Sequence, residues 1–122
     1  MKRKHHELLV WQEAIKLVKT IYEITSVFPK HEIYALASQM RRAAVSVPSN
    51  IAEGAGRGSD REFMQYLNIA RGSMSELETQ IIIGHKLGYI TDIKILNEKM
   101  EKLFGLLGGL IKHLKDKISV QT

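Results

Sequence analysis

The chain has 122 residues, which is enough for one domain with its own hydrophobic core. It contains no cysteine, and this excludes disulfide bonds, zinc–thiolate sites and thiol nucleophiles. Eighteen Lys and Arg residues against 13 Asp and Glu give a formal net charge of +5, which suits either an anionic partner or a soluble surface. No apolar run approaches the roughly 18 residues of a membrane-spanning helix. We therefore expect one cytoplasmic domain over residues 1–122, with no membrane partner.

The first helix is predicted over about residues 7–27. Apolar residues recur there at spacings of three and four from Trp11 to Phe28, as on the buried face of a helix. Phe28 precedes Pro29, and the residue before a proline is disfavoured in the helical conformation. The helix should therefore end at this point.

The second helix, predicted over about residues 31–55, has a proline in its interior. Such a proline removes one backbone hydrogen bond and costs about 3 kcal/mol or more. The apolar stripe from Ile33 to Ala55 nevertheless keeps its phase through Pro48, which itself falls beside the stripe. One long helix kinked at Pro48 is favoured. The alternative is a break at Pro48, with Ser49 or Asn50 capping a short further helix.

Two further helices follow at about residues 60–87 and 92–117. The glycine-rich residues 54–59 should end the second helix, and Ser59 with Glu62 forms a capping box that opens the third. Thr91 is the expected cap of the fourth helix, whose apolar residues alternate four and three apart. Because the connections are short, neighbouring helices should be antiparallel. The predicted fold is an all-α, antiparallel, up-down-up-down four-helix bundle.

The fourth helix contains three glycines, each of which costs up to about 1 kcal/mol relative to alanine. Together they would let another helix approach closely, and a second apolar line runs beside the main seam. We therefore expect a homo-oligomer whose interface includes Phe104, Gly105, Gly108, Gly109 and Ile111. The alternative is that the glycines accommodate bulky side chains of the first helix, such as Trp11, within one chain.

The sequence contains no motif that predicts catalysis. No Glu is followed three residues later by His, so a di-iron centre of the helical-bundle type is not expected. The glycines near residue 56 lack both the lysine and the preceding strand of a phosphate-binding loop. Nothing places a base beside a serine. We expect no enzymatic activity, no metal and no cofactor.

Polar residues follow one side of the second helix. An ordinary solvated face is the simplest explanation, but serine and asparagine are poor helix formers that such a face does not need. A groove or a subunit interface is the other explanation, with Arg42 structural and Arg41 exposed. The stripe consists of Gln39, Arg42, Ser46, Asn50 and Glu53.

The basic residues suggest a nucleic-acid partner, either RNA or DNA, held mainly through phosphate contacts. Few aromatic residues fall outside the core stripes, with Tyr34 as the exception, so backbone or shape recognition is favoured over base stacking. The alternative is a scaffold that docks another protein. The candidate phosphate contacts are Arg41, Arg57, Arg61 and Arg71, with Lys2, Arg3 and Lys4 as a flexible arm.

Two motifs carry a family resemblance, RRAAVSVPSNIAEG at residues 41–54 and ARGSMSELE at residues 70–78. Over about residues 8–90 the chain resembles the four-helix-bundle family named after proteins encoded in intervening sequences of bacterial 23S ribosomal RNA genes. The resemblance implies a small bundle that often assembles into a ring-like oligomer such as a pentamer. It also implies a fold shared with the accessory protein of diversity-generating retroelements, which binds nucleic acid and a reverse transcriptase through a basic surface. It implies no established biochemical role.

Overall fold

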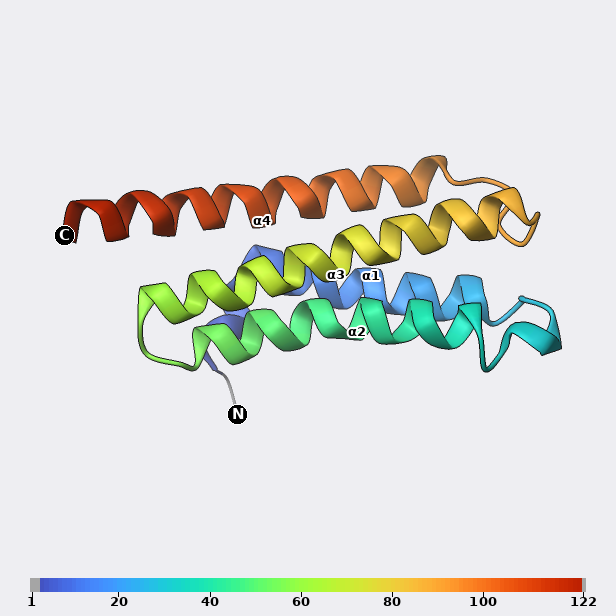
Figure 1. The fold of residues 1–122 in the computed structure, drawn as a ribbon, viewed down its shortest axis with the longest axis horizontal. Helices are drawn as coiled ribbons and strands as arrows, with labels where there is room; N and C mark the ends of the chain where they lie inside the picture. The colour runs from blue at the N-terminus through green and yellow to red at the C-terminus, as the bar shows by residue number, and fades with distance from the viewer. Residues whose placement is uncertain (1–2, 122) are drawn as a thin grey trace.

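The structure is a computed structural model that describes residues 3–121. Four long helices lie side by side, and each runs antiparallel to the one before it (Figure 1). No strand occurs in this part of the chain, so the predicted all-α four-helix bundle is confirmed. None of its helices combines the length and the apolar character needed to cross a membrane. The elements are η1 (Lys4–Glu7), α1 (Leu9–Thr25), η2 (Lys30–Glu32), α2 (Leu36–Ala55), α3 (Asp60–Lys86) and α4 (Lys94–Gln121).

The second and fourth helices begin later than the sequence predicted. α2 starts at Leu36 rather than near residue 31, because the backbone of Ala35 leaves the helical region with φ −122° and ψ −107°. The side chain of Glu32 then accepts a hydrogen bond from the Leu36 amide at 3.4 Å. Thr91 does not cap α4, which begins at Lys94; instead Asp92 Oδ1 accepts a hydrogen bond from the Lys94 amide at 3.0 Å.

Ser59 caps α3 as predicted, although only the serine half of the expected capping box is found. Ser59 Oγ accepts a hydrogen bond from the Glu62 amide at 3.2 Å, and the Glu62 carboxylate accepts one from the Ser59 hydroxyl at 3.1 Å. These contacts satisfy a backbone donor that the first turn of a helix leaves without a partner. The start of α3 is therefore encoded locally.

Pro48 lies inside α2, which continues through it without interruption. The prediction of one long helix is confirmed, whereas a bend at this position stays a prediction. Pro48 is buried, although its place beside the apolar stripe predicted otherwise. The reason is that α2 packs on both α1 and α3, so a wider arc of its surface is covered than one stripe describes.

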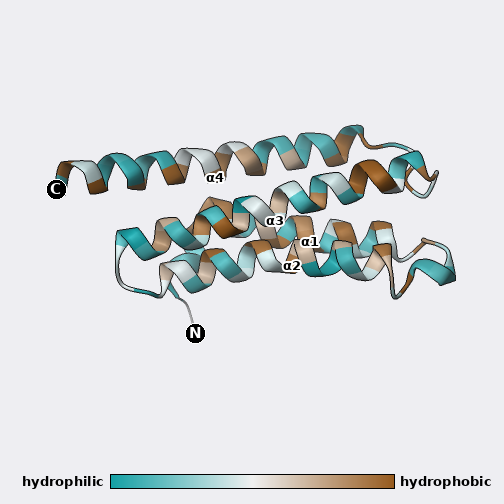
Figure 2. Cartoon of the chain, in the orientation of Figure 1, coloured by the Kyte–Doolittle hydropathy of each residue, from teal (hydrophilic) through white to brown (hydrophobic). Residues whose placement is uncertain are grey.

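Each helix buries one side, and hydrophobic and hydrophilic residues alternate along all four (Figure 2). The closest helix pair is α2 with α3, where a Cβ built on Gly54 would lie 2.6 Å from Tyr66 Cβ. Glycine is required at this position because no side chain fits between the two backbones. The largest fully buried side chains are Leu17, Ile21, Met40, Val47, Ile51, Leu67, Met74, Leu77, Ile81, Met100, Leu103 and Leu107.

The α1–α2 and α3–α4 connections meet at one end of the bundle. Phe28 and Tyr89 pack their rings with centroids 5.3 Å apart. The Tyr89 hydroxyl and His31 Nε2 share a hydrogen bond at 3.3 Å. The segment that leads into α2 is therefore held from the side of α3 and α4 as well as by its own helices.

Candidate binding groove

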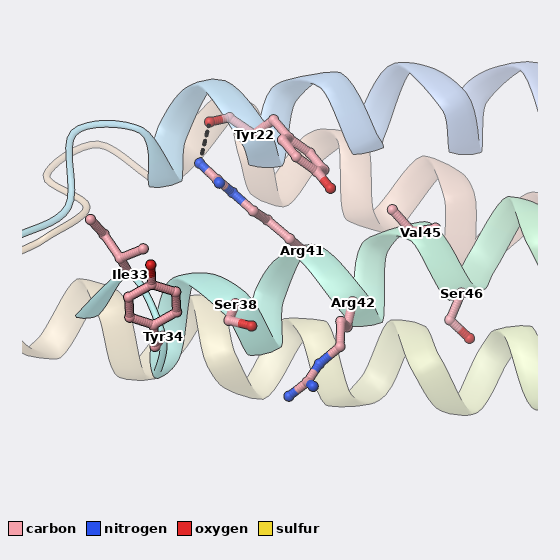
Figure 3. A pocket seen from close by; sticks show the side chains of 8 residues that line it. All are labelled: Tyr22, Ile33, Tyr34, Ser38, Arg41, Arg42, Val45 and Ser46. Atoms are coloured by element: carbon pink, nitrogen blue, oxygen red, sulfur yellow. Dashed lines mark hydrogen bonds between the residues drawn. The ribbon is translucent and has the colours of Figure 1, made fainter. Parts of the chain in front are cut away.

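An open groove of about 560 Å³ lies where the end of α1 meets the beginning of α2 (Figure 3). α1 contributes one lining residue, the turn before α2 contributes two, and α2 itself contributes the rest. Its lining includes two arginines and no Asp, Glu, His or Cys, so its charged groups are all positive. The lining residues are Tyr22, Ile33, Tyr34, Ser38, Arg41, Arg42, Val45 and Ser46.

Arg41 is fixed against α1. Its Nε donates a hydrogen bond to Thr25 Oγ1 at 2.8 Å, and its Nη2 approaches the Tyr22 carbonyl oxygen at 3.5 Å (Figure 3). The guanidinium carbon also lies 4.7 Å from the centre of the Tyr22 ring, within the range of a cation–π contact. The Thr25 hydroxyl is buried and donates in turn to the Ile21 carbonyl at 2.7 Å. The expectation that Arg41 is exposed is therefore wrong, because its side chain is half-buried and held by α1.

Arg42 has the opposite arrangement. Its side chain points away from Arg41 (Figure 3), and it is exposed. Within residues 3–121 no hydrogen bond or ion pair to it is found, so its structural role is also contradicted. Arg42 and Glu53 are separated by about 16 Å of helix, which is too far for a direct contact. Glu53 instead pairs with Arg57 at 3.7 Å.

The predicted polar stripe is not a separate surface. Its middle lies at the contact between α2 and α3, where Ser46 Oγ and Ser73 Oγ are 2.8 Å apart. Asn50 Nδ2 donates to the Ser46 carbonyl at 2.8 Å and to its hydroxyl at 2.9 Å. Gln39, at the beginning of the stripe, is exposed. The short polar side chains are explained by the close approach of two helices, which a longer side chain would prevent.

The other candidate arginines lie apart from this groove. Arg57 follows α2, donates to the Tyr66 hydroxyl at 2.7 Å and sits 5.2 Å over the ring of that residue. Arg71 donates to Asn68 Oδ1 on the preceding turn of α3 at 2.7 Å. Arg61, at the start of α3, is exposed, and no partner for it is found among the described residues. The structure thus separates the predicted set into a groove and two other regions.

The described part of the predicted N-terminal arm, residues 3–7, is docked on α1 and α2. The His6 ring accepts a hydrogen bond from the Arg3 amide at 3.0 Å and lies 4.9 Å from the Trp11 ring. Arg3 and Lys4 line a hollow against the end of α2, near the α2–α3 connection. Lys2 lies outside the described residues.

The glycines of α4 face open space. A Cβ built on Gly105, Gly108 or Gly109 meets no atom within 4 Å beyond its own helix, so these glycines do not accommodate Trp11 or any other described side chain. Phe104 is half-buried. Ile111, in contrast, is only 7% exposed and belongs to the core, so its assignment to an outer patch is wrong. α4 buries it because Ile111 continues the seam of Leu107.

The titratable side chains that line the groove are two arginines and two tyrosines. The lining contains no His, Asp, Glu, Lys or Cys, the other side chains that act as general acids and bases in enzymes. Within residues 3–121 no group of three or more His, Asp or Glu side chains is placed to hold a metal ion. The arrangement is suited to holding an anion beside an apolar surface.

Two residues of α1 were missed by sequence reasoning: Tyr22, which lines the groove, and Thr25, which accepts a hydrogen bond from Arg41. Both fall on the apolar stripe of the first helix, which assigned them to the core. Thr25 and Arg41 are 16 positions apart in the sequence. Neither this spacing nor the period of the stripe indicates that α1 contacts Arg41.

The fold is a small antiparallel helical bundle, and its groove is lined by two arginines together with apolar and aromatic residues. The family model of the 23S rRNA-intervening sequence protein matches residues 6–109, and the chain belongs to this family, as its motifs indicated. A solved structure, that of a protein with unknown function from the S23 ribosomal protein family of Bacteroides thetaiotaomicron VPI-5482, is similar with a TM-score of 0.64. The identity is 22% over 90% of this chain and 98% of that chain, so the likeness shows the fold alone. Comparison with curated proteins gives no match.

Proposed function

We propose that this protein is a non-catalytic nucleic-acid-binding protein that contacts phosphates through the α1–α2 groove. The observation that carries the proposal is the unpaired guanidinium of Arg42 in a groove that no carboxylate lines. Arg41 adds a second positive charge that faces a threonine hydroxyl and an aromatic ring rather than an acid. The net charge of +5 has the sign that a polyanionic partner requires.

Arg42 is better suited to phosphate than most of the other candidate arginines. A free guanidinium offers a planar set of donors that matches two phosphate oxygens. Arg57 is already partly neutralised by Glu53, and Arg71 is held by a neutral amide oxygen. Arg61 resembles Arg42, because it is exposed and no hydrogen bond or ion pair of its side chain is found among the described residues. Arg42 therefore joins the candidate contacts, and Arg41 helps mainly through its charge and its place in the groove.

The test is fluorescence-anisotropy binding to a structured RNA hairpin and a DNA duplex at low and physiological salt. Arg42→Ala should weaken binding and reduce the slope of log K against log salt by about one, because one phosphate contact is lost. Lys99→Ala is the matched control, since it removes the same charge from an exposed position on α4. Equal effects of the two variants would mean that only net charge matters. Absence of binding by the unmodified chain at low salt would overturn the proposal.

We also propose self-association through the glycine face of α4. What supports it is that Gly105, Gly108 and Gly109 lower helix propensity while serving no contact within the described chain. Gly109→Leu should shift the mass in light scattering towards one chain while leaving the helical circular dichroism unchanged. Gly72→Leu on α3, where a Cβ also meets nothing within 4 Å, is the control. A monodisperse single chain at micromolar concentration would exclude this proposal.

A second candidate function, a scaffold for a protein partner, is favoured by the apolar extension of the groove. A neighbouring hollow of about 310 Å³ shares Val45 with the groove and is lined by Trp11, Ile15, Val18 and Pro48 among others. Such an apolar surface is better suited to binding the apolar face of a partner helix than the phosphate backbone of a nucleic acid. Stoichiometric recovery of one protein after nuclease treatment, lost on Ile15→Glu, would support the scaffold.

A further inference from the structure

Tyr34 is the most exposed large hydrophobic residue among those described, with 96% of its surface accessible. It lies in the turn before α2, and its ring stands at the groove beside Ser38 (Figure 3). No ring contact, cation–π contact or hydrogen bond of Tyr34 is found within residues 3–121. The two faces of this ring are therefore open, and an aromatic face held in water is a good platform for another flat group.

Tyr22, the other tyrosine of the groove, is differently placed. Arg41 stacks over its ring at 4.7 Å, so this face is occupied within the chain. Tyr22 lies on α1, on the other side of the groove from Tyr34 (Figure 3). A ligand that enters the groove would thus meet an open ring at Tyr34 and a ring already paired with a cation at Tyr22.

We propose that the groove binds an unpaired nucleotide, with the base stacked on Tyr34 and a neighbouring phosphate on Arg42. The inference rests on the proposed function and names its ligand class, single-stranded RNA or DNA, including the nucleotides of loops and bulges. Bases of a duplex are stacked on each other and cannot present a face to a side chain, whereas unpaired bases can. An open groove of about 560 Å³ is within the range of small-ligand sites.

The polar groups of the groove fit the same ligand. Ser38 lines it, and no hydrogen bond of its hydroxyl is found in the described part of the chain, so this group can donate to a base edge or a phosphate. Arg42 supplies charge without a competing carboxylate. An acidic peptide would satisfy the arginines but would not use an open aromatic face in the same way. The combination of one free ring, one free hydroxyl and one free guanidinium therefore favours a nucleotide.

The test compares a single-stranded oligonucleotide of about ten residues with the same sequence in a duplex, using fluorescence anisotropy at physiological salt. Tyr34→Ala should weaken single-strand binding by roughly five- to 100-fold, the measured range for one base–aromatic stack. Duplex binding should be unchanged. Tyr34→Phe keeps the ring and should bind like the unmodified chain. Because Tyr34 is almost wholly exposed, neither change is expected to disturb the fold, which circular dichroism will check.

The outcomes separate this inference from the proposed function. If Arg42→Ala weakens binding to both nucleic acids while Tyr34→Ala alters neither, phosphate binding stands and the nucleotide site is overturned. Equal loss with Tyr34→Ala and Tyr34→Phe would also overturn it, because the ring would then not be the contact. If the unmodified chain binds neither form, both proposals fail.

Discussion

Gly54 lies in the last turn of α2, where the chain leaves no room for a side chain. In Gly54→Ala the new Cβ would lie 2.6 Å from Tyr66 Cβ and 3.2 Å from the Phe63 carbonyl oxygen, well inside the usual separation of about 3.5 to 4.0 Å. Both atoms are tied to the backbone of α3, so α2 and α3 must move apart. Overpacking of this kind costs about 1 to 3 kcal/mol, against a gain of up to about 1 kcal/mol in helix propensity. We expect a net loss of about 1 to 2 kcal/mol.

The assay is urea denaturation followed by circular dichroism at one fixed protein concentration, so that any self-association contributes equally. Gly72→Ala makes the same chemical change in the middle of α3, where a Cβ meets nothing within 4 Å. That variant should be more stable than the unmodified chain by up to about 1 kcal/mol. The two changes should therefore have opposite signs. If Gly54→Ala is as stable as Gly72→Ala, the close approach of α2 and α3 at this point is refuted.

Two other changes test single contacts. Thr25→Val removes the hydroxyl that accepts from Arg41 Nε at 2.8 Å and should cost about 1 to 2 kcal/mol in urea denaturation, whereas Thr25→Ser should retain most of that stability. The hydrogen bond from Lys102 holds the pKa of Glu13 below its ordinary value. A lowered pKa in the folded state stabilises the protein while Glu13 is ionised, and this contribution is lost as the pH falls through that pKa. Lys102→Ala should therefore lower the free energy of unfolding by at most about 1 kcal/mol at neutral pH and should not change it in acid. If the variant is also less stable than the unmodified chain in acid, the pairing of Lys102 with Glu13 is not the cause.

The helices could be predicted from the sequence because their determinants are local. The hydrogen bond from the Glu62 amide to the Ser59 side chain needs only four consecutive residues, and the apolar period needs only the neighbouring turns. The start of α2 was placed too early because Ile33 fits the period of the stripe. Ile33 is 46% exposed, and the chain leaves the helical conformation at Ala35. Periodicity indicates which residues share a face, but it does not indicate whether a tertiary connection keeps the chain helical there.

The groove could be predicted only in part. Adjacent residues on a helix point about 100° apart, so the sequence shows that Arg41 and Arg42 diverge. The sequence does not show which of the two arginines contacts another helix, because the contact depends on the Thr25 hydroxyl of α1, which accepts the hydrogen bond from Arg41. The assignment of the structural arginine was reversed for this reason. Tyr34 was identified as an exposed aromatic residue, and its position beside a basic groove became visible only in the fold.

The contact between the α1–α2 and α3–α4 connections affects how the groove would bind a ligand. The segment before α2 is fastened by the His31–Tyr89 hydrogen bond on one side and by the Glu32 contact to the Leu36 amide on the other. Tyr34 follows directly, so its backbone has little freedom although its ring is open to water. Ordering a loop on association usually consumes part of the binding free energy. Here part of that ordering is completed when the chain folds, because the backbone that leads to Tyr34 is already held, so affinity for a flat ligand should depend on contact with the ring rather than on loop closure.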